Sequence, residues 1–341
     1  MKEPLALLMN DLHIDRNTVS EFEKNWEEAV SICVKKGIFD IVIGGDVFTS
    51  SSSQSLPVLL AVRHALLLAK SKDIHVTIAE GNHDLVSEEE LEGYCHIFAS
   101  YPGIDVVDVY QVLEWSDCDY RLVVMSYFPE NGSFSSRLES MREKLGDVSN
   151  VILYIHEGVH GALGDFEVPK EVMPDLFDGF KMVLCGHYHN RCQIKDTEIY
   201  YIGASRAHNF GEDSKKGYTV LYDDGTIEFI QNKVNIRYHT IEIDYDELDS
   251  LEDNLPGNSL YKTRVKINCT DAQSKLIDKQ HILDMGIGKV EIVSEKVAKV
   301  DIESTGIDEK YDNAGIRDKY KAFCKEKDID NKLGLKYLEK L

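Results

Sequence analysis

The chain has 341 residues, of which 43% are hydrophobic and 29% are charged, a composition that fits one large globular domain with a smaller unit attached. Its 60 acidic and 38 basic residues give a formal net charge of −22, which disfavours broad, non-specific attraction to nucleic acid, so a polyanionic substrate would be held by local basic groups or by metal ions. Seven cysteines without a CxxC pair indicate reduced thiols, and the lack of a signal-peptide pattern or a membrane-length apolar run favours a cytoplasmic protein without a membrane partner.

Short apolar runs alternate with longer amphipathic runs through the first two-thirds of the chain. The apolar runs predict strands at residues 5–9, 40–45, 75–80, 121–127, 150–155, 181–185, 198–203 and 218–223. The amphipathic runs predict helices at about residues 19–36, 57–71, 87–99 and 133–145. This alternation indicates an α/β core whose first strands pair in parallel, while the short turn at 223–225 favours antiparallel pairing of the later strands.

The pattern changes after about residue 235. Alternating segments predict strands at 237–244 and 263–268, residues 270–286 predict a helix, and one or two strands follow at 289–303, which together make a small α+β unit. The remaining residues have a helical pattern, and 316–341 contain eight Lys or Arg against five Asp or Glu, a charge opposite in sign to that of the body. The chain is therefore expected to divide into residues 1–235, 236–305 and 306–341.

Metal-ligand residues follow five of the predicted strands, each at the point where the strand ends. They are Asp11, His13, Asp46, Asn82, His156, His187 and His189. Because sites in α/β sheets are assembled at the carboxyl ends of strands, we expect these side chains to meet. Alternate residues at an extended strand end project to the same side, so Asp11 and His13 can share one ion.

The residue types indicate a centre with two divalent ions. Such ions, about 3.5–4 Å apart, need an anionic bridge, which we assign to Asp46. Mixed carboxylate, imidazole and amide ligands suit manganese, iron or zinc better than calcium. His83 is then an imidazole beside the site that can stabilise the transition state or protonate a leaving oxygen, and Asp84 can hold its tautomer.

These motifs in order carry a resemblance. D-x-H, G-D, G-N-H-D, the lone histidine after 150–155 and G-H-x-H form the signature of the calcineurin-like metallophosphoesterase superfamily, which the sequence resembles over about residues 4–230. The resemblance implies a β-sandwich flanked by helices, with His83 as the catalytic histidine. It also implies that one ion is bound by Asp11, His13, Asp46 and His189, and the other by Asp46, Asn82, His156 and His187. The sequence departs from the GDxxD pattern of many members at Thr49, where the missing acid is not usually a ligand.

A narrower resemblance rests on GGDVFTSSSSQSL (44–56), GNHD (81–84), HEGVHG (156–161), GHYHNR (186–191) and YIGASRAHNFGEDSKKGY (201–218). These stretches are similar to the nuclease subunit of DNA double-strand-break repair complexes, the SbcD type, in a short phage-like or bacterial version. That resemblance implies a manganese-dependent exonuclease and endonuclease that forms a homodimer. It further implies a capping domain that binds DNA and a C-terminal helical segment that binds a coiled-coil ABC-type ATPase.

Some assignments keep two interpretations. Tyr188, Arg191 and His208 are candidates for contact with substrate, or else ordinary rim and loop residues. Residues 56–70 form either a core helix or, as the resemblance suggests, a dimer helix. The chain could also be a stand-alone metallophosphoesterase for a small phosphoester, or a binding scaffold with an inactive fold, although the intact His83 and the complete ligand set argue against a scaffold.

Overall fold

The computed structural model describes residues 2–87, 91–116, 118–164, 168, 170–258, 260–294 and 324–325. The chain divides into two compact units, residues 1–268 with 277–292, and residues 269–276 with 293–341. The predicted C-terminal segment 306–341, apart from 324–325, and any strand beyond 294 lie outside the described residues. In the described part, no helix has the length and apolar character needed to cross a membrane.

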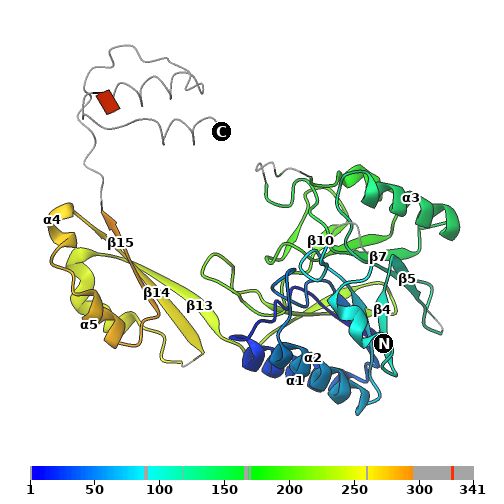
Figure 1. Cartoon of the computed structure of the whole chain (residues 1–341), viewed down its shortest axis with the longest axis horizontal. Helices are drawn as coiled ribbons and strands as arrows, with labels where there is room; N and C mark the ends of the chain where they lie inside the picture. The colour runs from blue at the N-terminus through cyan, green and yellow to red at the C-terminus, as the bar shows by residue number, and fades with distance from the viewer. Residues whose placement is uncertain are drawn as a thin grey trace. The chain divides into compact units, whose positions relative to one another are not determined.

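The first large sheet has six strands in the order β12-β11-β1-β2-β3-β4. The strands are β1 (Pro4–Met9), β2 (Asp40–Gly44), β3 (His75–Ala79), β4 (Ile104–Val107), β11 (Gly217–Tyr222) and β12 (Ile227–Gln231). β1 to β4 are parallel, whereas β11 is antiparallel to both of its neighbours. Helices α1 (Val19–Lys36) and α2 (Leu56–Lys70) pack on the outer face of this sheet (Figure 1).

The second large sheet has the order β5-β6-β7-β8-β10-β9. Its strands are β5 (Tyr110–Leu113), β6 (Arg121–Met125), β7 (Val151–Ile155), β8 (Met182–Cys185), β9 (Cys192–Gln193) and β10 (Ile199–Tyr201). Helix α3 (Ser133–Leu145) covers its outer face, and the 3-10 helix η2 (Pro174–Phe177) joins the same apolar cluster.

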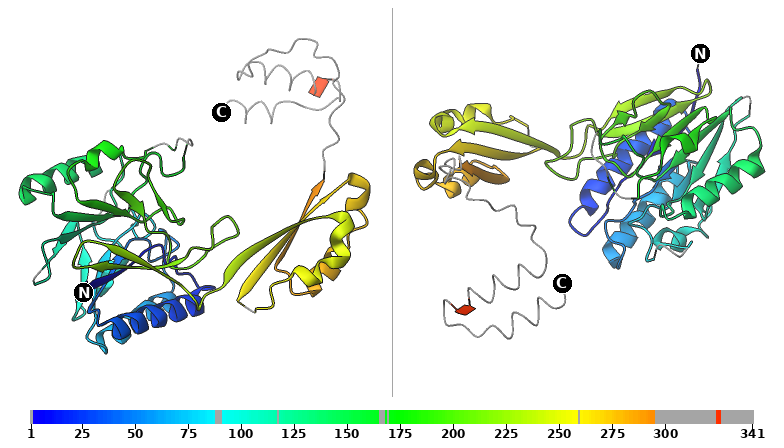
Figure 2. Two further views of the ribbon diagram at one scale, coloured as in Figure 1. Left: turned by 180° about the vertical axis from the view of Figure 1, so that it is seen from behind. Right: turned by 90° about the horizontal axis from the view of Figure 1, so that it is seen from above.

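The inner faces of the two sheets form a common core. Leu8 and Val42 of the first sheet belong to the same buried cluster as Leu122 and Ile152 of the second. The ribbons of the two sheets can be followed in Figure 2. The central strands are covered on both faces, which explains why the sequence shows them as continuous apolar runs rather than as alternating ones. The chain therefore forms the expected α/β sandwich, with two sheets flanked by helices.

A third, three-stranded sheet consists of β13 (Arg237–Asp244), β14 (Tyr261–Cys269) and β15 (Lys289–Ser294). One face of this sheet packs with its own short helices, which are η3 (Tyr245–Ser250), η4 (Glu252–Asn254) and α5 (Lys279–Asp284). Helix α4 (Asp271–Ser274) belongs to the second compact unit. The sheet is the predicted small α+β part, whereas the domain boundaries at 235 and 305 stay a prediction.

Most of the predicted elements are confirmed, and two helices are not. Among their described positions, residues 87–99 contain only the 3-10 helix η1 (Tyr94–Phe98). The buried carboxylate of Glu80 accepts hydrogen bonds from the backbone N–H groups of Gly93 and Cys95, and these bonds hold the segment in a path that is not α-helical. The single helix expected at 270–286 is two short helices, since Asp278 caps a second start by accepting from the backbone N–H groups of Gln280 and His281.

Candidate metal centre

Polar side chains from five strands converge at the carboxyl ends of the two large sheets. β1, β2 and β3 are followed by Asp11, His13, Asp46 and Asn82, and β7 and β8 are followed by His156, His187 and His189. Ligand atoms of Asp11, His13 and His189 lie within 4.8 Å of one another, and so do those of Asp11, Asp46 and His156. Asn82 joins them through its Oδ1, which is 3.2 Å from Nδ1 of His187. The structure thus brings all seven predicted ligands together.

Asp46 lies between the two groups of ligands. Its Oδ2 is 3.5 Å from Nε2 of His13 and 3.2 Å from Nε2 of His156. The two imidazole nitrogens of His13 and His189 approach each other to 3.0 Å. A carboxylate oxygen that faces ligands of both groups has the position that a bridging ligand requires.

The backbone at the site is strained. Asp11, His13, Asp46 and His187 have φ values of 51°, 43°, 55° and 84°, in the left-handed region that side chains other than glycine seldom adopt. Among the described residues, only three other non-glycine residues share this conformation. Strain of this kind costs about 1–3 kcal/mol per residue and concentrates at functional sites, where the surrounding structure holds it in place.

Two glycines allow the strand ends to approach one another. A Cβ atom on Gly45, whose φ is 103°, would lie 2.3 Å from Nδ1 of His156. A Cβ atom on Gly81 would lie 2.2 Å from Oδ1 of Asp46. Neither position can carry a side chain without displacing a predicted ligand, which explains the glycine in the G-D and G-N-H-D motifs.

Burial and charge set the protonation of the cluster. Asp46 and His156 are buried, and burial alone would lower the pKa of His156, but the carboxylates of Asp46 and Asp11 outweigh burial and raise that pKa to about 10. Burial would raise the pKa of Asp46, yet the neighbouring imidazoles of His156 and His13 hold it below its usual range. Burial and the charge of His156 lower the pKa of His187 to about 4.

The donor set fits divalent metal ions. Nδ1 of His156 lies 2.8 Å from the carbonyl of Gly44, so its buried Nε2 faces the cluster, 3.2 Å from Oδ2 of Asp46. A cation at this point would take the place of the proton between Nε2 and Asp46, because ligating imidazoles must be deprotonated. Carboxylates, imidazoles and one amide are ligands of transition metals rather than of calcium.

His83 lies beside the predicted ligands. Its backbone N–H donates to Oδ1 of Asp46 at 3.0 Å, and its Nδ1 is 2.8 Å from the carbonyl of Thr49. Its ring meets that of His13 edge to face, with 5.0 Å between centroids. His83 lines an open cleft of about 390 Å³ together with His13, Asp46, His187 and His189.

Asp84 has a different role from the predicted one. Its Oδ2 accepts hydrogen bonds from the backbone N–H groups of Gly81 and Val47, and its Oδ1 accepts one from Phe48. The buried carboxylate therefore ties the G-N-H-D turn to the segment after Asp46. The carbonyl of Thr49, rather than Asp84, orients the imidazole of His83, so the tautomer-holding role is corrected.

The family follows from the sequence over this same region. Residues 6–191 match the sequence profile of calcineurin-like phosphoesterases, and this range includes all seven ligands and His83. The chain belongs to the calcineurin-like phosphoesterase family. The family hydrolyses phosphoesters with divalent metals, and the ligand clusters of this phosphoesterase supply sites for them.

Individual relatives are distant. The SbcD subunit of nuclease SbcCD from Staphylococcus saprophyticus is 24% identical over 234 residues, which cover 61% of this chain and 62% of that protein. The phosphoesterase therefore spans less than two-thirds of this relative. Matching solved structures include a dimetal phosphatase from Danio rerio, with a TM-score of 0.41 and 11% identity over 64% of this chain and 93% of that one. Nuclease MPE from Pseudomonas putida matches with a TM-score of 0.30 and 14% identity over 66% of this chain and 87% of that one.

Two predicted substrate contacts of the phosphoesterase lie next to its ligands. His208 lines the cleft, with its Nε2 2.8 Å from the carbonyl of Asp11. Tyr188 stacks on His187 at 5.0 Å between centroids, and its hydroxyl donates to Glu171 at 2.6 Å. Both side chains hold ligand-bearing segments, and their contact with substrate stays a prediction.

Arg191 is directed elsewhere. Its guanidinium donates to the carbonyl of Ile202 and to Oγ1 of Thr219, and it stacks over the ring of Phe229 at 4.3 Å. Through these contacts the side chain of Arg191 packs on strands β11 and β12 of the first sheet, so the structure favours a structural role over the predicted contact with substrate.

Sequence reasoning missed two residues that support the ligands of the phosphoesterase. Glu212 accepts from Nδ1 of His189 at 2.9 Å, which fixes the orientation of that imidazole. Arg206 is buried, and its Nη2 donates to the carbonyls of Leu12 and His13. Both residues lie in the stretch 201–218, which resembles SbcD-type nuclease subunits. That resemblance concerns the stretch as a whole and does not indicate what either residue does.

Proposed function

We propose that the chain is a two-metal DNA nuclease, an exonuclease and endonuclease that hydrolyses phosphodiester bonds with manganese. The observation that carries this proposal is the position of His83, which faces the cleft beside both ligand groups but is assigned to neither. Asp11, His13, Asp46 and His189 would hold one ion, and Asp46, Asn82, His156 and His187 the other. The ions supply polarisation of the phosphate and activation of the attacking water.

In this proposal His83 donates a proton to the leaving oxygen. Its Nδ1 faces the carbonyl of Thr49, an arrangement in which Nδ1 carries hydrogen, so as a general acid His83 would act as the imidazolium and give the leaving oxygen its second proton, from Nε2. A histidine held by one hydrogen bond in this way is oriented before substrate arrives, which is the requirement for general acid catalysis.

DNA is the proposed substrate for two reasons. Five stretches of the sequence resemble SbcD-type nucleases, and the relative from Staphylococcus saprophyticus is a nuclease subunit. The polar face of β14 also carries Lys262, Arg264 and Lys266 at alternating positions, a row of cations in an acidic protein, in which the middle member, Arg264, is paired with Glu291 at 3.5 Å. Such a row suits the phosphates of a nucleic acid without reading its sequence. Residues 236–305 would then be the DNA-binding capping domain.

The proposal includes protein partners and a location. Helix α2 buries Val58 and Leu66 in the core but exposes Leu56, Leu60 and Leu67, which supports its use as a homodimer surface. Residues 306–341 would bind a coiled-coil ABC-type ATPase, a proposal that rests on the sequence alone. The complex would act in DNA double-strand-break repair and recombination in the cytoplasm of a bacterium, or of a host if the chain is phage-encoded.

A small phosphoester is the second candidate substrate. A cleft of about 390 Å³ lies within the range of small-molecule sites, about 300–1,000 Å³. In that case the chain would be a stand-alone phosphoesterase, and the cation row on β14 would be irrelevant to turnover.

Turnover on two substrates distinguishes the candidates. Single- and double-stranded DNA and an aryl phosphate would be incubated with the protein in manganese, in magnesium and in EDTA. The nuclease proposal expects metal-dependent cleavage of DNA, and it expects Lys262→Glu with Lys266→Glu to weaken DNA binding and flatten its salt dependence without changing aryl phosphate hydrolysis. Turnover of the aryl phosphate with no cleavage of DNA would refute the nuclease proposal.

A further inference from the structure

Arg206 contacts the backbone of the D-x-H segment. Only 4% of the residue is exposed, and its Nη2 donates at 2.7 Å to the carbonyl of Leu12 and at 2.8 Å to the carbonyl of His13. These two carbonyls follow Asp11, so a single cationic group fixes the peptide on both sides of the predicted ligand His13. The remaining carbonyl of the segment, that of Asp11, is contacted by Nε2 of His208 at 2.8 Å.

The segment needs such support because its backbone is strained. Asp11 and His13 both have positive φ, and a chain left to itself would relax toward the right-handed or extended regions. The turn is also held by backbone hydrogen bonds from Leu12 and His13 to the carbonyl of Asp46. Arg206 donates to the carbonyls of the same two residues, so both the N–H and the C=O groups of Leu12 and His13 are held by hydrogen bonds.

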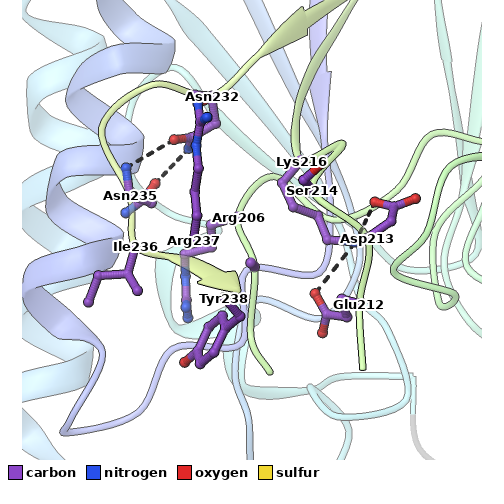
Figure 3. Close-up of a pocket in the computed structure, with 11 residues that line it drawn as sticks. Arg206, Glu212, Asp213, Ser214, Lys216, Asn232, Asn235, Ile236, Arg237 and Tyr238 are labelled. Atoms are coloured by element: carbon purple, nitrogen blue, oxygen red, sulfur yellow. Dashed lines mark hydrogen bonds and ion pairs between the residues drawn. The ribbon is translucent and has the colours of Figure 1, made fainter. Parts of the chain in front are cut away.

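Arg206 is itself held at a fixed position. Its neighbour Ser205 donates from its backbone to the carbonyl of Asn10 and accepts at its own carbonyl from Asn232. Asn232 is hydrogen-bonded to Asn235 (Figure 3). Asn235 in turn donates to the backbone carbonyl and the carboxylate of Glu21 on α1. This buried polar network restricts the movement of residues 205 and 206, so the guanidinium is presented to the turn with little freedom.

From this geometry we infer that Arg206 is a positioning residue of the metal centre: it holds Asp11 and His13 in the conformation that binds metal. The inference rests on the proposed function only in requiring that the cluster bind metal. Arg206 touches no substrate, and its effect passes through the ligand backbone. An ammonium group cannot replace it fully, because the planar guanidinium places its donors in a fixed arrangement.

Arg142 provides a matched control. Its Nη2 also donates to two backbone carbonyls, those of Leu176 and Asp178, and its Nε is buried without a hydrogen-bond partner, as is that of Arg206. Arg142 lies on α3, which carries no predicted ligand. Replacing either arginine by methionine removes the same kind of contact, but only one of the two contacts holds a ligand segment.

The test is calorimetric titration of metal-free protein with Mn²⁺, together with thermal unfolding of the same samples. Arg206→Met and Arg142→Met should both lower the melting temperature, but only Arg206→Met should weaken Mn²⁺ binding, by about 10–100-fold as for other residues that orient metal ligands. At saturating Mn²⁺ the KM for DNA should stay near wild type. Arg206→Lys should recover part of the lost affinity.

Equal Mn²⁺ affinity in the two methionine variants would overturn the inference. If Arg206→Met does not fold, Arg206→Lys decides the question, since unchanged affinity overturns the inference and a loss of about threefold or more supports it. The wild-type protein is titrated with Mn²⁺ before any variant. If it binds no Mn²⁺, that result refutes the proposed function itself and this inference with it.

Discussion

Replacing His83 by alanine should abolish hydrolysis while leaving the metal centre in place. The structure separates these two effects, because His83 contacts Asp46 only through its backbone N–H, at 3.0 Å, and alanine keeps that group. The imidazole itself is hydrogen-bonded to the carbonyl of Thr49 and faces the cleft. The substitution therefore removes the proposed proton donor and leaves every predicted ligand in contact with its neighbours.

The expected magnitudes differ between activity and stability. General acid catalysis contributes about 10²–10⁴-fold, so kcat should fall by that factor, which corresponds to about 3–5 kcal/mol of transition-state stabilisation. The lost hydrogen bond to Thr49 is partly exposed to solvent, so its removal costs about 0.5–1.5 kcal/mol of folding free energy. For a protein of this size, the melting temperature should shift by only a few degrees, on the order of 2–4 °C per kcal/mol.

The assay measures kcat on DNA, metal content by elemental analysis, and melting temperature for His83→Ala and for His281→Ala. His281 is a suitable control because it is an exposed histidine on α5 whose backbone N–H also donates to an aspartate, Asp278. The control should match wild type in all three measurements. Loss of metal in His83→Ala, or a fall in kcat of less than about tenfold, would refute the division of roles in the G-N-H-D motif.

Three other predictions concern the surroundings of the site. Gly81→Ala would place a Cβ atom 2.2 Å from Oδ1 of Asp46, so it should reduce Mn²⁺ affinity in a calorimetric titration at least tenfold, and full affinity would show that the turn can yield. The hydrogen bond with Glu80 raises the pKa of His96 to about 9, so this pair should stabilise the fold fully below about pH 6.5 and lose its effect as pH rises through about 9. His96→Gln should flatten the melting temperature over that interval, and an unchanged pH profile would contradict the pairing. Truncation after Thr305 should preserve folding, metal content and cleavage of short single strands but prevent co-purification with the ATPase, whereas unfolding would mean that the removed residues pack on the body.

The sequence predicted the central strands because they are buried on both faces and leave continuous apolar runs. It missed β4, β5, β9 and β12. β4, β5 and β9 are short, and β5, β9 and β12 have no buried residue, so their sequences carry little periodicity. The helix expected at 87–99 did not form because the carboxylate of Glu80, which follows β3, accepts hydrogen bonds from the backbone of that segment. Local patterns cannot report a competing contact from outside the segment.

The convergence of the seven predicted ligands could be foreseen because each follows a strand that the sequence shows clearly, whereas their binding of metal stays a prediction. The residues that hold these side chains in place could not be predicted from the sequence. Arg206 and Glu212 lie in a loop without periodicity, and only the folded chain shows that they contact the His13 segment and His189. The role of Asp84 was misassigned because proximity in sequence to His83 does not reveal that three backbone N–H groups already occupy its carboxylate.

The central claim is that the chain holds two divalent ions with Asp46 between them. Anomalous diffraction from crystals soaked in Mn²⁺ tests it most directly. The account predicts two peaks per chain, one against Asp11, His13 and His189, the other against Asn82, His156 and His187, and both in contact with Asp46. A single peak, or two peaks that do not share Asp46, would contradict it.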